Sequence, residues 1–271
     1  MPSMQKIPVY VVSCETAMKR RALIKAHLDG LRIEYQLIDA VIGANLDPEY
    51  RERVNPTKNM TPGALGCYLS HIHLYEHIIA NQLSVALVLE DDTVLDYRVK
   101  ALLDDGCENL DFDYCFLCYE DRGDESYVFY DADSAIELGN VFKAYLLSSG
   151  PYCTNAYLIT LEGAKKRMQC AFPARTPIDH YHFLPYRPCF RAVVPVVAFM
   201  NVHSAIDSLS STTWTLNQQR LHKYWWFYPL RDLIKFKPLK KMLFYRRAKF
   251  PHAGRWYSYS SAVKVVPRNR Y

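Results

Sequence analysis

The strongest constraint on the fold is a short apolar segment that ends in three carboxylates, SVALVLEDD at residues 84–92. A continuous apolar run of this length, with helical patterns on either side, indicates a strand buried on both faces of a parallel sheet. Its acidic end, Glu90, Asp91 and Asp92, then lies at the carboxyl edge of the sheet, where open α/β folds bind ligands. A divalent cation that bridges diphosphate oxygens offsets the repulsion between these carboxylates. The alternative is a solvated acidic turn.

The chain before this segment alternates strand and helix patterns. Residues 7–12 (IPVYVV) predict a strand, residues 16–31 a helix with Arg20 and Arg21 in its opening turns, and residues 33–38 a second strand. Thr61 and Pro62 have the residue types of an N-cap and a first helical position, and apolar residues at helical spacing extend this helix to residue 79. The β-α-β order predicts an α/β fold with a parallel sheet.

The chain after the acidic segment predicts further strands and short helices. We expect a helix over residues 99–110, strands over 114–119, 127–130, 141–146 and 152–160, a helix over 162–171 and one strand over 192–200. Cys115 and Cys118 form a C-x-x-C, but no second pair of ligands with zinc-site spacing accompanies them. Because they lie in a strand pattern, we expect ordinary core thiols.

The composition favours a folded intracellular protein. Half of the 271 residues are hydrophobic and 14% are aromatic, which argues against disorder. The eight cysteines lack the dense spacing of a secreted disulfide scaffold. The sequence shows neither a signal-peptide pattern nor the roughly 18–20 consecutive apolar residues of a spanning helix. We therefore expect a cytoplasmic protein.

Charge divides the chain into two parts. Residues 1–216 carry 19 Lys and Arg against 27 Asp and Glu, a net charge of −8, whereas residues 217–271 carry 14 against 1, a net charge of +13. We expect a catalytic domain over 1–216 and a basic aromatic C-terminal extension over 217–271. Interleaved aromatic and basic residues favour docking on an anionic membrane surface. The alternatives are packing on the body or, least favoured, nucleic-acid binding; we expect no nucleic-acid partner.

Several sequence blocks occur in an order typical of one enzyme family. They are VYVVSCETAMKRR (9–21), IDAVIG (38–43), TPGALGCYLSH (61–71), ALVLEDD (86–92) and TNAYLIT (154–160). Together they resemble glycosyltransferase family 25, the lipopolysaccharide and lipooligosaccharide biosynthesis enzymes related to collagen galactosyltransferases. Two departures stand out: Ser13-Cys14 replaces the usual Asn-Leu, and Ala64 stands where an acidic residue is common.

The resemblance implies a GT-A-like fold, which is a Rossmann-type mixed sheet flanked by helices. It also implies an inverting transfer of a hexose, galactose from UDP-galactose, onto a lipooligosaccharide or lipopolysaccharide acceptor. A lipid-linked acceptor places the protein at the inner face of the cytoplasmic membrane, as a peripheral protein.

The resemblance also suggests roles for the charged residues near the acidic segment. ALVLEDD matches the family's metal motif, so Glu90 and Asp92 are expected to hold Mn²⁺ or Mg²⁺, which stabilises the diphosphate leaving group. Asp91 is expected to orient ribose or water. Arg20 or Arg21 is expected to pair with phosphate, and the alternative for both arginines is an ordinary surface position.

Four further residues complete the predicted site. Ser70 and His71 are expected to line the nucleotide pocket, with core packing as the alternative. Asp179, in TPIDHYHF, is expected to be the base that takes the acceptor proton, with a structural role as the alternative. His203, after the last apolar strand, is expected to be a further metal ligand, with a hydrogen-bonded structural role as the alternative.

Two other functions remain open at this point. One is a metal-dependent phosphoester hydrolase that uses the same acidic cluster, although such enzymes usually gather more His and Asp ligands than this chain offers. The other is a catalytically silent, membrane-associated protein that still binds a nucleotide sugar. The departures at Ser13, Cys14 and Ala64 leave room for this second possibility.

Overall fold

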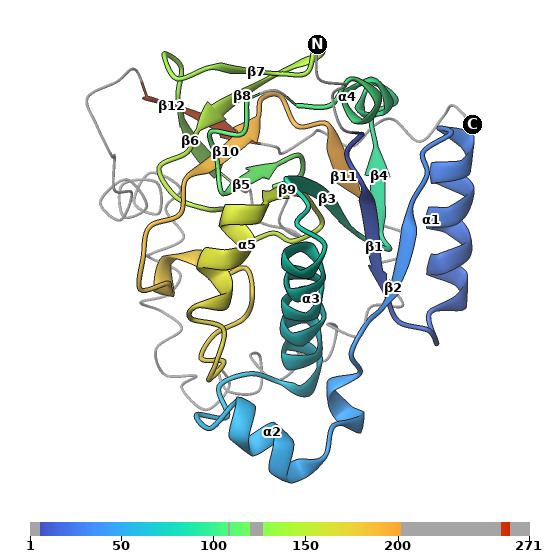
Figure 1. Ribbon diagram of the computed structural model, residues 1–271, viewed down its shortest axis with the longest axis vertical. Coiled ribbons are helices and arrows are strands. Elements are labelled where there is room, and N and C mark those ends of the chain that lie inside the picture. Colours follow the sequence, from blue (N-terminus) through green and yellow to red (C-terminus); the bar gives the residue numbers. More distant parts are fainter. Residues whose placement is uncertain (1–5, 108, 120–126, 202–255, 261–271) are drawn as a thin grey trace, which may run out of the picture.

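An eight-stranded mixed sheet forms the centre of the computed structural model, which describes residues 6–107, 109–119, 127–201 and 256–260 (Figure 1). The strand order is β2-β1-β3-β9-β5-β10-β8-β7. In chain order these strands are β1 (Val9–Ser13), β2 (Gln36–Asp39), β3 (Val85–Glu90), β5 (Tyr114–Phe116), β7 (Ile136–Leu138), β8 (Phe142–Leu146), β9 (Ala156–Thr160) and β10 (Phe190–Val193). The prediction of a Rossmann-type mixed sheet flanked by helices is confirmed.

The strand that ends in the carboxylates, β3, lies near the middle of this sheet. It pairs in parallel with β1, which places Val12 opposite Glu90, and antiparallel with β9, which places Leu89 opposite Ala156. Five of its six residues are buried, which confirms a strand covered on both faces. The antiparallel neighbour differs from the all-parallel surroundings that the apolar run suggested, because burial on both faces does not encode strand direction.

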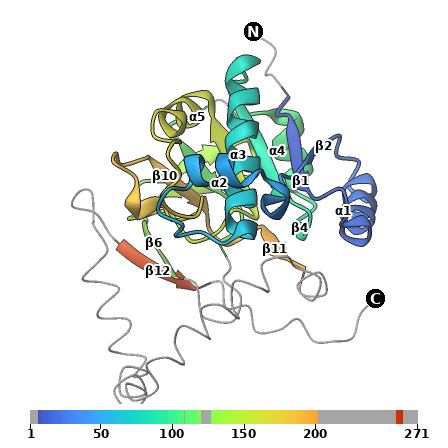
Figure 2. The same ribbon diagram turned by 90° about the horizontal axis from the view of Figure 1, so that it is seen from below.

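Helices cover the two faces of the sheet (Figures 1 and 2). On one face α3 (Pro62–Ala80) and α5 (Leu161–Met168) pack on residues such as Tyr10, Val88 and Tyr157. On the other face α1 (Met18–Gly30) and α4 (Val99–Asp105) pack on residues such as Val11 and Leu87. Alternate residues of the same strands thus supply both cores, as expected for a sheet buried on two sides.

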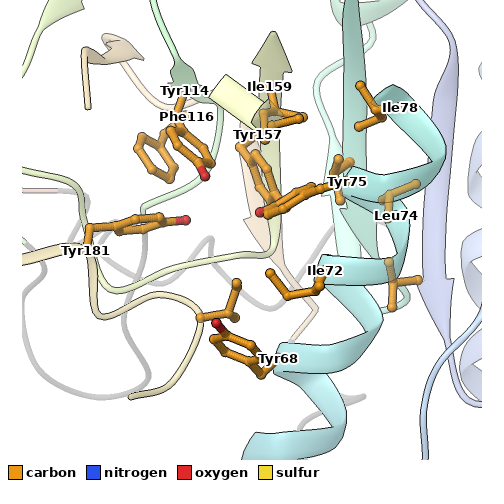
Figure 3. Packing of buried hydrophobic residues seen from close by; sticks show 14 of the residues in the cluster. Tyr68, Ile72, Leu74, Tyr75, Ile78, Tyr114, Phe116, Tyr157, Ile159 and Tyr181 are labelled. Carbon is orange, nitrogen blue, oxygen red and sulfur yellow. The ribbon is translucent and has the colours of Figure 1, made fainter. Parts of the chain in front are cut away.

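The core under α3 and α5 is unusually rich in tyrosine. Figure 3 shows Tyr75 on α3 and Tyr157 on β9 pointing toward one another, and their hydroxyl oxygens lie 2.7 Å apart. Tyr114, Phe116 and Tyr181 pack beside them with ring centroids 5.4–6.3 Å apart. A buried phenol needs a hydrogen-bond partner, so the Tyr75–Tyr157 pair is a polar contact built into an apolar layer.

Close backbone contact joins the start of α3 to the turn after β2. Thr61 caps α3, because its Oγ1 accepts a hydrogen bond from the Ala64 N–H at 3.2 Å, as the sequence predicted. The turn contains a 3₁₀ helix, η1 (Gly43–Asn45), and a Cβ at Gly43 would lie 1.9 Å from the Pro62 carbonyl oxygen. A Cβ at Gly66 would lie 2.3 Å from the Val41 carbonyl oxygen. The glycines of IDAVIG and GALGC therefore allow two backbones to touch.

Replacing Gly43 by alanine is expected to lower the free energy of unfolding by about 3 kcal/mol, because backbone on both sides must move to admit the methyl group. For a domain of this size the melting temperature then falls by about 9 °C. Gly30→Ala is the matched control, since nothing lies within 4 Å of its added Cβ. Thermal unfolding followed by circular dichroism measures both variants, and equal melting temperatures would contradict the prediction.

Several predicted boundaries are wrong. The single strand expected over residues 192–200 is two strands, β10 and β11 (Ala198–Met200), because the chain leaves the sheet near Pro195, which cannot donate a ladder hydrogen bond. The helix expected to reach residue 110 ends at Asp105, since Gly106 has a φ of +73°. The strand expected from residue 152 begins at Ala156. Elements that the sequence did not predict include α2 (Pro48–Val54), β4 (Thr93–Leu95), β7 and η2 (Tyr181–Phe183).

Two strands of the C-terminal part pair outside the main sheet. β11 pairs antiparallel with β4, directly after the acidic segment. β12 (Trp256–Ser260) pairs antiparallel with β6 (Tyr127–Asp131), so five residues of the predicted extension are bound to the body (Figure 2). The other residues of 217–271 lie outside the described residues, and so does the proposed division at residue 216. No helix in the described ranges is long and apolar enough to cross a membrane.

Candidate functional site

The candidate site lies where several strands of the sheet reach one edge. β1, β2 and β3 run parallel and end at Ser13, Asp39 and Glu90. β9 is antiparallel to β3, so the residues that precede it, Thr154 and Asn155, lie at the same edge. The topology therefore brings together polar residues from distant parts of the chain.

Asp91 is bound by residues from β1 and α1. Ser13 Oγ donates a hydrogen bond to Asp91 Oδ2 at 2.6 Å, and Arg20 Nη1 lies 3.2 Å from Asp91 Oδ1. Burial raises the pKa of Asp91, and the Ser13 hydrogen bond and the Arg20 charge oppose this shift. The middle carboxylate therefore already has a cationic partner within the protein.

The two adjacent arginines of α1 have different surroundings. Arg21 donates to the carbonyl oxygens of Ser13 and Cys14 at 2.8 and 2.9 Å and forms an ion pair with Asp39, so it binds the ends of β1 and β2 together. The Arg20 side chain is only 12% exposed and lies toward Asp91. Its Nε has no hydrogen-bond partner among the described residues. Phosphate binding stays a prediction for both arginines.

Asp92 is held in place by amide groups. Asn155 Nδ2 donates to Asp92 Oδ1 at 2.5 Å, and the Asn201 N–H donates to the Asp92 carbonyl oxygen at 2.6 Å. The Asn155 carbonyl oxygen in turn accepts the Glu90 N–H at 2.8 Å and the Thr93 hydroxyl at 2.8 Å. Asn155 thus fixes the backbone and one carboxylate of the acidic segment, a role that the sequence did not reveal.

Glu90 faces α3, on which His71 lies. Thr154 Oγ1 donates to Glu90 Oε1, and His71 Nε2 lies 3.6 Å from the same oxygen. The His71 side chain is fully buried, and its Nδ1 lies 2.7 Å from the Tyr157 hydroxyl. His71 therefore connects the tyrosine pair of the core to the carboxylate edge.

Cys67 completes this side of the site. It lies one helical turn before His71, and donor atoms of Cys67, His71 and Glu90 all lie within 4.8 Å of one another. Burial raises the pKa of the Cys67 thiol well above its usual range, and the charges of Glu90 and Asp179 raise it further. No role was predicted for Cys67 from the sequence, although its spacing of four residues from His71 could have indicated a pair of metal ligands on one helix face.

Asp179 approaches from the turn before η2. Burial raises its pKa, the His180 and His71 charges lower it, and the Glu90 charge raises it. These mutual effects place Asp179 within electrostatic reach of Glu90 and His71, although it lies far from them in the sequence. A carboxylate with a raised pKa is a stronger base, but the role of a base stays a prediction.

The two remaining residues of the predicted site are Ser70 and His203. Ser70 is buried, and its hydroxyl donates to the Gly66 carbonyl oxygen at 2.7 Å and accepts the Val41 N–H at 2.8 Å. These bonds tie α3 to the turn after β2, and nucleotide contact by Ser70 stays a prediction. His203 lies outside the described residues, so its role as a metal ligand also stays a prediction.

Comparison with known proteins identifies relatives of the chain. Residues 6–182 match the sequence model described as glycosyltransferase family 25 (LPS biosynthesis protein). Procollagen galactosyltransferase 1-A of Xenopus laevis is 29% identical over 195 residues, which cover 65% of this chain and 30% of the relative. Inactive glycosyltransferase 25 family member 3 of Homo sapiens is 27% identical over 194 residues, which cover 65% of this chain and 31% of the relative. The match thus spans about a third of the length of these relatives.

The comparison with solved structures matches HddC from Yersinia pseudotuberculosis. The similarity covers 69% of this chain and 89% of that chain, at 12% identity and a TM-score of 0.35. The family assignment rests instead on the sequence match, which spans well over half of the chain and includes β1, α3, the acidic segment and Asp179. The chain belongs to glycosyltransferase family 25.

Proposed function

We propose that this chain is an inverting, metal-dependent glycosyltransferase that moves galactose from UDP-galactose onto a lipooligosaccharide or lipopolysaccharide acceptor. The observation that carries the proposal is the meeting of Glu90, Asp91 and Asp92 with Arg20 and His71 at the edge of the sheet, in a chain of this family. The names of the relatives support galactose, and the description of the family supports the acceptor.

The acidic segment offers donors that suit Mn²⁺ or Mg²⁺. Both cations prefer carboxylate oxygens, and Glu90 and Asp92 are oriented by hydrogen bonds from Thr154 and Asn155. These two residues would hold the cation, whereas Asp91 is engaged by Ser13 and Arg20. A cation bound there supplies Lewis-acid stabilisation of the diphosphate leaving group.

The residues around the carboxylates position the donor. Arg20 places a guanidinium beside Asp91, where its remaining N–H groups can bind a phosphate oxygen. Asp91 keeps that guanidinium near the carboxylates and orients ribose or water. Ser70 and His71 form part of the wall of the nucleotide pocket.

Asp179 is the proposed base. Inversion requires a group that takes the proton from the acceptor hydroxyl as the hydroxyl oxygen attacks the anomeric carbon. Asp179 lies on a different segment from Glu90 but within reach of the Glu90 charge, which suits an approach from the acceptor side. Burial raises its pKa, which increases its basicity.

A second candidate function is nucleotide-sugar binding without transfer. It is favoured by the human relative, which is named an inactive family member, and by the replacement of Asn-Leu by Ser13-Cys14. Ser13 is nevertheless used in this chain, since it donates to Asp91. The two candidate functions both include binding of a nucleotide sugar, and they differ in whether the sugar is then transferred to an acceptor.

One assay separates these functions. The full-length protein is incubated with a panel of UDP-sugars, Mn²⁺ and a truncated lipooligosaccharide, and UDP release and acceptor mass are followed. UDP release that depends on the acceptor, with a gain of one hexose in mass, is expected. Nucleotide binding without turnover would favour the silent protein, and hydrolysis of phosphate esters without transfer would favour a hydrolase.

The basic extension is proposed to dock the enzyme on an anionic membrane, which places it beside a lipid-linked acceptor. Because β12 pairs with β6, deletion of the extension would also remove part of the fold. The test therefore replaces basic residues and leaves the segment in place. Glutamine replacements are made at Lys235, Lys237, Lys240 and Lys241. Each lost lysine is expected to weaken binding to phosphatidylserine vesicles by about fivefold at low salt.

The matched control removes the same number of charges from the body. It carries glutamine at Lys19, Lys25, Lys58 and Lys143, which are exposed. Vesicle co-sedimentation at low and high salt compares the two variants with the wild type. Equal binding by both variants would show that the extension does not direct docking.

A further inference from the structure

We propose that Cys67, His71 and Glu90 form a binding site for Zn²⁺ or a cation of similar softness. The donors are a sulfur, an imidazole nitrogen and a carboxylate oxygen, which lie within 4.8 Å of one another. This set differs in chemistry from the all-oxygen set of Glu90 and Asp92, although the two sets share Glu90. Binding of Zn²⁺ requires no sugar transfer, so the site is testable with the metal alone.

The distance between the histidine and glutamate donors is close to that of a zinc site. Zinc bonds of about 2.3 Å to sulfur and about 2.0–2.2 Å to nitrogen and oxygen place tetrahedral donors about 3.3–3.7 Å apart. His71 Nε2 and Glu90 Oε1 already lie 3.6 Å apart. Cys67 and His71 are one turn apart on α3, and the sulfur lies within 4.8 Å of the other two donors, so the proposal requires a side-chain rotation that brings it to the same centre. Three protein ligands leave a fourth position open.

The burial of His71 favours a cation bound at the point where the three donors meet. His71 Nε2 is buried and has no hydrogen-bond partner among the described residues, and it is directed toward Glu90. An unsatisfied buried polar atom costs free energy, which a bound cation would recover. The other nitrogen, Nδ1, lies 2.7 Å from the Tyr157 hydroxyl, and that hydroxyl lies 2.7 Å from the Tyr75 hydroxyl.

This tyrosine pair acts on the imidazole as outer-shell groups do in metal sites. When Nδ1 donates its proton to the Tyr157 hydroxyl, Nε2 carries the lone pair that a metal needs. The Tyr157 ring also stacks on the His71 ring, with centroids 5.8 Å apart, and holds it in place. The imidazole is therefore oriented before any cation arrives.

Donor chemistry selects the cation. A thiolate and an imidazole favour Zn²⁺ or Co²⁺ over Mg²⁺ and Mn²⁺, which prefer oxygen. The other core thiols that the sequence singled out are Cys115 on β5 and Cys118 just after it; both are buried and belong to no comparable group of donors in the described ranges. Cys67 is thus the cysteine that the fold pairs with a histidine and a carboxylate.

The first experiment uses Co²⁺ as a spectroscopic probe. The full-length, metal-stripped protein is titrated with CoCl₂, and thiolate-to-cobalt charge-transfer absorption is followed in the near ultraviolet. We expect saturation at one equivalent, loss of the band on addition of Zn²⁺, and no loss with equimolar Mn²⁺. Cys67→Ser is expected to abolish the band, whereas Cys170→Ser, at another partly exposed cysteine, is expected to keep it.

A third variant separates this site from the proposed transferase. Asp92→Asn leaves Cys67, His71 and Glu90 intact, so it is expected to keep the cobalt band even where turnover is lost. Zinc X-ray absorption of the wild type provides a measurement that needs no folded variant, and one sulfur neighbour at about 2.3 Å is expected. Absence of a sulfur neighbour, or a cobalt band that survives Cys67→Ser, would overturn the proposal.

Discussion

Replacing Asp92 by asparagine is expected to lower metal-dependent turnover by about 10³-fold, the size of effect seen when one transition-state charge stabiliser is removed. The amide has the shape of the carboxylate but lacks its charge, so it binds a divalent cation far more weakly. Asp92 is 3% exposed, and its Oδ1 accepts a hydrogen bond from Asn155. An asparagine oxygen can accept the same bond, so the fold is expected to survive.

The measurement is acceptor-dependent UDP release over a range of Mn²⁺ concentrations, together with the melting temperature. Asp104→Asn is the matched control, since this exposed carboxylate on α4 pairs with Lys100 and lies outside the acidic segment. We expect the control to keep the wild-type rate. A wild-type rate in Asp92→Asn would remove Asp92 from the metal site and leave Glu90 as the remaining carboxylate ligand.

Replacing Asp179 by asparagine is expected to lower kcat by about 10²–10⁴-fold with little change in the affinity for UDP. The amide cannot accept the acceptor proton, and loss of a positioned general base has an effect of this size. Because burial is the main reason that the pKa of Asp179 is raised, a neutral amide is expected to be tolerated there without loss of stability. The variant thus tests chemistry rather than folding.

Two measurements distinguish a base from a structural residue. UDP binding by calorimetry reports whether the donor pocket remains intact, and the rate of acceptor-dependent turnover reports the chemistry. Tight UDP binding with slow turnover is expected. Parallel loss of UDP affinity and turnover would assign Asp179 to donor binding or structure, and an unchanged rate would exclude it as the base.

Much of the central fold was predictable because local signals and burial agree there. The apolar run of β3 and the Thr61-Pro62 start of α3 were both recognised correctly, and the carboxylates were placed at the end of a buried strand. The direction of β9 was not predictable, since either direction buries the same residues. The division between β10 and β11 was missed because an apolar run continues across Pro195.

The site was predicted less completely than the fold, because its hydrogen bonds join residues far apart in the sequence. Thr154 and Asn155 bond to Glu90 and Asp92 across more than sixty positions, and no periodicity encodes such a contact. The pairing of adjacent carboxylates with different partners was equally hidden. Glu90, the last residue of β3, lies toward α3, whereas Asp91, in the turn that follows, lies toward α1.

The pairing of β12 with β6 changes the topology of the basic extension. β11 and β12 both pair with strands of the body, so the segment that joins them is attached to the body at both of its ends. The entropy cost of joining two fixed points by a chain segment grows only slowly with the length of the segment. Cutting it would turn the β6–β12 pairing from an intramolecular contact into a bimolecular one, which dilution dissociates.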